Sequence, residues 1–121
     1  MYSNKAWREV MALLQSASAL VFASLYEGFG LPVIEAFAAR CPVIASNTTS
    51  LPEVTGNAAW AVDPLDASSI SAAMLDVLSN DAVRTERIEI GLERALQFTW
   101  QECARQTLAV YRKVLAAHPK A

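Results

Sequence analysis

The first 62 residues alternate between segments with helical spacing and short, uninterrupted apolar runs. The apolar runs, at residues 19–23, 42–45 and 58–62, are too short for buried helices and suit strands that are covered on both faces. Before and between them lie segments expected to be helical, at residues 6–17, 31–40 and 51–55. Such alternation predicts an α/β fold in which parallel strands are joined by right-handed crossovers.

After this alternating part the sequence indicates helices only. Asp66 is expected to cap a helix over residues 67–79, and Asp81 to cap the next one. The second helix has apolar residues expected on one face, namely Ile88, Leu92, Ala95 and Leu96. Thr99 and Glu102 have the spacing of a capping box for a last helix. The apolar stripe of that helix is Ala104, Leu108, Tyr111 and Leu115.

Three strands are half of what a doubly wound nucleotide-binding domain normally contains. We therefore expect a single partial domain over residues 1–121, half of a Rossmann-like unit with a helical tail. Its parallel part is predicted at residues 6–65 and its helical part at 66–118.

Composition excludes several classes of function. A net charge of −2 argues against a nucleic-acid partner, because phosphate binding requires an excess of positive charge. One histidine, His118, and two distant cysteines, Cys41 and Cys103, leave no catalytic triad and no metal cluster. Two thiols, both expected to be buried, and a start unlike a signal peptide predict a reducing, cytoplasmic location. No apolar run suffices to span a bilayer, so membrane contact is left open only for the basic end of the last helix.

The chemistry is concentrated in residues 27–35, Glu-Gly-Phe-Gly-Leu-Pro-Val-Ile-Glu, between a predicted strand and a predicted helix. Gly28 and Gly30 let the backbone approach a ligand, and the first turn of the helix can bind a diphosphate. Glu35, one turn into that helix, can accept hydrogen bonds from a ribose diol. Glu27 lies at the carboxyl end of the strand, where it can contact sugar hydroxyls or stabilise positive charge at an anomeric carbon.

Plainer interpretations apply to parts of this stretch. Two glutamates eight residues apart occur by chance in many chains, and Phe29 and Leu31 are also compatible with core positions. The complete string, with both glycines and the proline between a strand and a helix, is far more specific.

That string resembles the E-x7-E signature of retaining glycosyltransferases of the GT-B type, the group that includes glycogen synthases and mannosyltransferases. Further stretches resemble the same family, namely A-S-L-Y at 23–26, C-P-V-I-A-S at 41–46, S-L-P-E-V at 50–54, D-P-L-D at 63–66 and F-T-W at 98–100. The likeness covers nearly all of residues 6–115 and implies the last half of a donor-binding domain.

The resemblance also implies roles for individual residues. Glu27 would be catalytic, and the donor, a GDP- or UDP-sugar, would be bound by Gly28, Phe29, Gly30, Leu31 and Glu35. Residues that could line the donor site are Thr48, Thr49 and Ser50. Glu53 is expected to be structural, capping the short helix. Neither a metal nor another cofactor is implied, since the helix end and cationic side chains would neutralise the diphosphate.

The chain departs from the family pattern in two respects. It has no counterpart of the upstream arginine and lysine that clamp the diphosphate in the family. It also has no counterpart of the loop that packs on the nucleobase, or of the acceptor domain, so the isolated chain is expected to be inactive. Arg40 stands where the family usually has glycine, which implies a left-handed helix end or a different one.

A non-catalytic interpretation also remains: a module that binds nucleotide sugars, or an interaction subunit completed by another chain. Either the acceptor domain or a second copy is expected to cover the exposed strand edge at residues 19–23. The alternative is that the first helix or the N-terminal residues fold over this edge.

Overall fold

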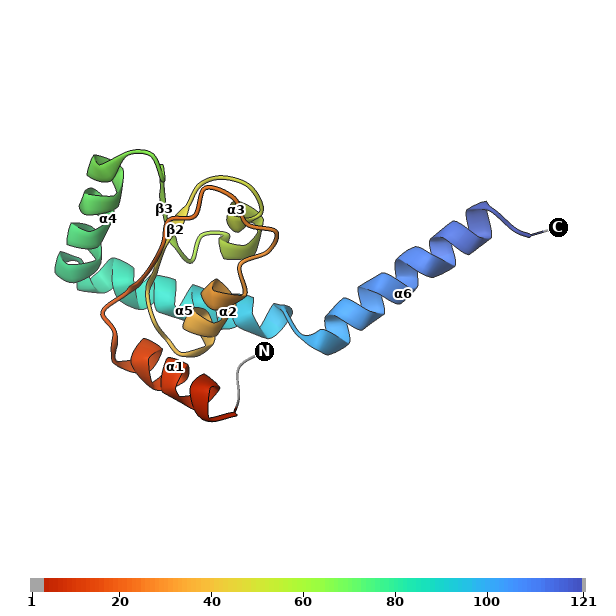
Figure 1. The fold of residues 1–121 in the computed structure, drawn as a ribbon, viewed down its shortest axis with the longest axis horizontal. Helices are drawn as coiled ribbons and strands as arrows, with labels where there is room; N and C mark the ends of the chain where they lie inside the picture. The colour runs from red at the N-terminus through yellow and green to blue at the C-terminus, as the bar shows by residue number, and fades with distance from the viewer. Residues whose placement is uncertain (1–3, 121) are drawn as a thin grey trace.

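A computed structural model describes residues 4–120 and has the predicted α/β architecture (Figure 1). The elements of the described range are α1 (Asn4–Ser16), β1 (Leu20–Phe22), α2 (Leu31–Ala38), β2 (Val43–Ser46), α3 (Leu51–Thr55), β3 (Trp60–Val62), α4 (Ala67–Ser79), α5 (Asp81–Gln97) and α6 (Trp100–Ala117). Every predicted strand and helix is present, and the boundaries differ by a few residues.

The strands form one parallel sheet in the order β1-β2-β3. Leu20 is paired with Val43, and Ile44 with Trp60. All four residues of the central strand β2 are buried, as a strand covered on both faces requires. The same expectation is wrong for β1, where Val21 is 39% exposed, because α4 covers that face of the sheet mainly over β2 and β3.

Alternation along β2 divides the core into two layers. Val43 and Ala45 pack on one face of the sheet with the buried residues of α2 and α3. Ile44 packs on the other face with Trp60, Val62 and the buried face of α4. Helices α2 and α3 therefore lie on one side of the sheet, with Leu14 of α1 and with Ile90 and Ala95 of α5. On the other side α4 packs together with Val83 of α5.

Trp60 connects the second core layer to helices α4 and α5. Its indole Nε1 donates a 2.6 Å hydrogen bond to Oδ2 of Asp76 in α4, which lowers the pKa of that carboxyl. The guanidinium of Arg87 in α5 lies 4.3 Å from the centre of the Trp60 ring.

Helix α5 packs closely against α2 at Gly91, which is buried. A Cβ atom at this position would lie 2.8 Å from Cδ1 of Phe37, a core residue of α2. The predicted apolar face of α5 is therefore wrong in part: Leu96 is 78% exposed, and the closest approach is made by a glycine.

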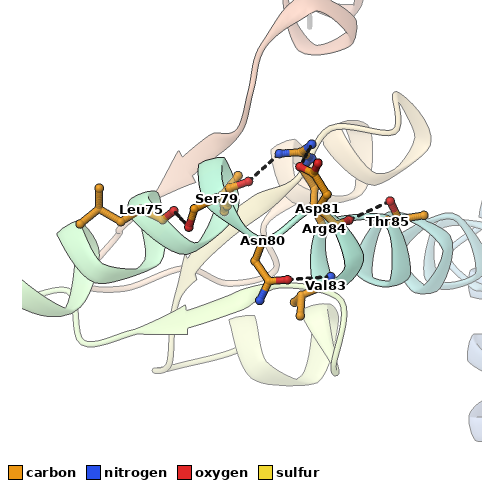
Figure 2. Close-up of polar contacts among 8 residues, drawn as sticks. Leu75, Ser79, Asn80, Asp81, Val83, Arg84 and Thr85 are labelled. Carbon is orange, nitrogen blue, oxygen red and sulfur yellow. Dashed lines mark hydrogen bonds and ion pairs between the residues drawn. The ribbon is translucent and has the colours of Figure 1, made fainter.

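The junction of α4 and α5 corrects another expectation. Asn80, not Asp81, is the N-cap of α5, and its side chain accepts a hydrogen bond from the N–H of Val83 (Figure 2). Asp81 is already helical and forms an ion pair with Arg84. Asp66 caps α4 as predicted, accepting from the N–H of Ser68 at 2.9 Å.

Arg40 ends α2 in the left-handed conformation that glycine usually adopts, with φ of 60°. Its N–H donates to the carbonyl of Phe37, and the N–H of Cys41 donates to that of Ala36, the pair of bonds that defines a Schellman motif. The strain costs arginine about 1 kcal/mol. An exposed 2.6 Å ion pair with Glu89 offsets little of that cost.

Helix α6 projects away from the rest of the fold (Figure 1). Thr99 caps it by accepting from the N–H of Glu102, but the predicted capping box is only half formed. The Glu102 carboxylate accepts instead from Arg105 and Gln106, which lowers its pKa to about 2. The described residues of α6 include no buried one, and its predicted apolar stripe is exposed to solvent.

The contact at Gly91 makes a prediction about stability. We expect Gly91→Ala to lower the free energy of unfolding by up to about 2 kcal/mol, because overpacking costs about 1–3 kcal/mol and a gain in helix propensity of about 1 kcal/mol offsets only part of it. Chemical denaturation measures this, with Glu93→Ala on the exposed side of α5 as the control. A Gly91→Ala protein more stable than the parent would contradict the close packing.

Candidate functional site

The candidate site lies at the carboxyl ends of the three parallel strands. Residues 23–30 follow β1, residues 47–50 follow β2 and residues 63–66 follow β3. Because the strands are parallel, these loops share one edge of the sheet, where open α/β sheets bind their ligands.

Gly30 makes the turn from the first loop into α2. Its φ is 99°, which side-chain-bearing residues rarely adopt, and a Cβ atom would lie 2.7 Å from Cδ2 of the fully buried Leu51. Gly28 has no heavy atom within 4 Å of its ideal Cβ position. The first glycine therefore faces open space, and the second permits contact between the loop and α3.

Glu27 is held by the neighbouring loop through its backbone. Its N–H donates to Oγ1 of Thr49 at 3.3 Å, and its carbonyl accepts from Oγ of Ser50 at 2.7 Å. Its carboxylate accepts a 3.0 Å hydrogen bond from Oγ of Ser24. Thr49 has a φ of 58°, so strained backbone accompanies this contact between the loops.

The N-terminus of α2 is open. Its N-cap, Gly30, has no side chain, Pro32 has no N–H, and Leu31 is 53% exposed. Glu35, in the second turn, is partly buried, and its carboxylate makes no hydrogen bond within the described residues. The positive end of α2 thus has Glu27 before it and Glu35 after it along the chain.

The predicted lining residues differ in what they contact. Thr49 and Ser50 bind the backbone of Glu27, whereas Thr48 is exposed. The expected capping by Glu53 is wrong, since α3 has no side-chain cap hydrogen bond. Glu53 contributes through its backbone carbonyl, which accepts from Arg94.

Sequence reasoning missed two residues that reach this region. Phe98, the C-cap of α5, places its ring against Phe29, with centroids 5.4 Å apart and planes at 76°. Arg94 lies in the last turn of α5 and binds the end of α3. The resemblance of residues 98–100 to a family segment was the available signal for Phe98. For Arg94 the signal was its spacing from Arg84 and Arg87, which places the three arginines on one face of the helix.

A hollow of about 330 Å³ lies elsewhere, beside Ser18 and Pro42 at the amino ends of the strands. Arg40 and Arg84 line it, and both are already ion-paired with carboxylates. Residues 4–120 contain no group of three or more side chains that could hold a metal ion. Over the same range no helix is long and apolar enough to cross a membrane.

The two glycines differ in a way that mutation can test. We expect Gly30→Ala to lower the free energy of unfolding by about 1–3 kcal/mol, because alanine is strained at this φ and its methyl group overlaps Leu51. Gly28→Ala is the matched control and should stay within about 0.5 kcal/mol of the parent. Equal stability of the two variants in urea denaturation would contradict the close approach of the loop to α3.

Comparison with known proteins agrees with this geometry. Residues 1–94 match the family described as Glycosyl transferases group 1. O-antigen chain mannosyltransferase B of Escherichia coli is 45% identical over 100 residues, 83% of this chain and 26% of that protein. Glycogen synthase of Mycobacterium tuberculosis is 37% identical over 106 residues, 85% of this chain and 26% of that protein.

Among solved structures, sucrose-phosphate synthase from Thermosynechococcus elongatus matches with a TM-score of 0.75 and 34% identity, over 90% of this chain and 28% of the other. The chain thus spans about a quarter of the length of these relatives. It belongs to the group 1 glycosyl transferases and contains a three-stranded parallel unit of the GT-B fold.

Proposed function

We propose that the carboxyl edge of the sheet binds the nucleotide-sugar donor of a retaining glycosyltransferase. The supporting observation is the turn of β1 into α2 through Gly30, which leaves an uncapped, exposed helix N-terminus between two glutamates. An uncapped helix start favours a diphosphate, and a carboxylate favours sugar hydroxyls.

Each part of the loop has a role in this proposal. The N-terminus of α2 and the backbone of Phe29, Gly30 and Leu31 face the diphosphate and the transferred sugar. Glu35 accepts hydrogen bonds from the ribose hydroxyls. Glu27 faces the anomeric carbon, where the bond to the leaving phosphate breaks and positive charge develops. The helix end stabilises the departing diphosphate by its dipole, with no metal required.

Transfer needs more protein than these 121 residues provide, since the relatives are about four times as long. The chain alone therefore binds a GDP- or UDP-sugar without transferring it, and the acceptor, a glycan or lipid-linked sugar, is bound by another part of the enzyme. Both cysteines are free, which fits a cytoplasmic location. Cys41 is buried as expected, but Cys103 is exposed, because α6 has no buried residue.

Calorimetric titration with a panel of UDP- and GDP-sugars tests donor binding directly. Supplying the upstream part of a relative then separates the two functional interpretations. Sugar transfer by the reconstituted pair supports the enzyme, and binding without transfer supports a non-catalytic module. Absence of binding to the whole panel would contradict the proposal.

The ribose role of Glu35 predicts a specific loss. Glu35→Ala should weaken donor binding by about tenfold to a hundredfold, because a charge-assisted hydrogen bond to a hydroxyl contributes roughly 1.5–3 kcal/mol. Glu53→Ala, an exposed glutamate of α3, is the control and should bind like the parent. Equal losses in the titration would refute this role.

The free edge of β1 predicts association. Within the described residues β1 pairs only with β2, and its sequence Leu-Val-Phe has neither charge nor proline to block a further strand. A strand from another part of the enzyme or a second copy would fill this edge. Light scattering over a concentration series should show dimers of the isolated chain, and a monomer at every concentration with cooperative unfolding would contradict this prediction, because it would show that the edge is covered.

A further inference from the structure

Residues 27–30, which we call the glycine loop, are held on one side by α3 and by the turn before it. Thr49 and Ser50 bind the backbone of Glu27, and Leu51 abuts Gly30. These contacts fix the start of the loop and its last residue. They leave Phe29, between them, without a hydrogen bond to this turn.

Phe29 is held instead by a residue far along the chain. The ring of Phe98 meets it edge to face, at a centroid distance of 5.4 Å. This is a favourable aromatic geometry, since the positive edge of one ring lies on the negative face of the other. Phe98 is the C-cap of α5, so the contact joins the loop to the end of that helix.

Arg94 connects the same aromatic pair to α3. Its guanidinium lies 5.4 Å from the centre of the Phe98 ring. It also donates to the carbonyls of Glu53 and Val54, which lie near the C-terminus of α3. One side chain therefore stabilises both Phe98 and the helix that abuts Gly30.

These contacts form a closed ring. They lead from the loop to the turn before α3, through α3 to Arg94 and Phe98, and back to the loop at Phe29. A closed ring restricts the loop more than the contacts with α3 or with Phe98 alone, because movement at Phe29 must break the aromatic contact or displace α3.

We propose that Phe98 and Arg94 are positioning residues that hold Phe29, Gly30 and Leu31 in the geometry that presents their backbone to the donor diphosphate. The proposal rests on the proposed donor site for its functional meaning, but the restraint on the loop exists without nucleotide. Neither residue touches the donor; each acts through the loop.

Amide hydrogen exchange of the nucleotide-free chain tests the restraint. Phe98→Ala should speed exchange at Val33, whose N–H donates to the carbonyl of Gly30 at 3.0 Å, by about twofold to tenfold, the range expected for loss of one aromatic pair. Exchange in β2 and β3 should not change. Phe98→Tyr preserves the ring and should restore slow exchange. Trp100→Ala removes a neighbouring, highly exposed ring and is the matched control.

Arg94→Lys keeps the charge but loses the planar fork that spans two carbonyls. It should speed exchange at Gly56, whose N–H donates to the carbonyl of Pro52 at the end of α3, and at Val33. Unchanged exchange at Val33 in the Phe98→Ala and Arg94→Lys proteins would overturn the proposal. Uniformly faster exchange that includes β2 and β3 would also overturn it, because that pattern indicates a general loss of stability.

Titration with UDP and GDP separates this proposal from the donor site itself. If the parent binds and Phe98→Ala binds more weakly while Phe98→Tyr binds normally, the positioning role is supported. If Phe98→Ala binds as tightly as the parent despite faster exchange, the positioning role is wrong and the donor site stands. If the parent binds neither nucleotide, the donor site and the positioning role both fail, and faster exchange shows the restraint alone.

Discussion

The close approach of Gly30 to Leu51 is the constraint on which the candidate site depends. The loop after β1 must turn into α2 while it lies against α3, and only a residue without a Cβ leaves room for Leu51. The same turn leaves the start of α2 exposed and brings Glu27 within hydrogen-bonding distance of Thr49 and Ser50. Gly30 thus allows the close packing with Leu51 in the core and also determines the shape of the candidate site.

Helix α5 stabilises this arrangement from the other side through its arginines. All three donate to backbone carbonyls of other parts of the chain: Arg84 to Val77, Arg87 to Ala59, and Arg94 to Glu53 and Val54. Helix ends leave carbonyls without intrahelical partners, and the bonds to α4 and α3 satisfy such groups, whereas the bond to Ala59 satisfies a carbonyl just before β3. Gly91, between Arg87 and Arg94 in the sequence, lets α5 approach Phe37 of α2 closely.

The sequence predicted the sheet and the loop because both depend on local pattern. Apolar runs, glycine positions and the Asp66 cap are readable over a few residues, and the structure agrees with them. The errors arise where distant segments decide the outcome. Val21 is exposed because α4 covers that face of the sheet mainly over β2 and β3, and Leu96 is exposed because α5 contacts α2 through Gly91. Asn80 displaces Asp81 as a cap because the two lie side by side and either could serve.

The contact of Phe98 with Phe29 could not be predicted for the same reason, since 68 residues separate the two rings along the chain. Its position has a structural consequence. Phe98 is the last fixed point before α6, which begins at Trp100 and extends from the fold with its apolar stripe exposed (Figure 1). Phe98 therefore lies between two parts of the fold with different surroundings. Its ring packs on Phe29 and lies beside the guanidinium of Arg94, whereas α6, which follows it, makes its own N-cap at Thr99 and has no buried residue in the described chain.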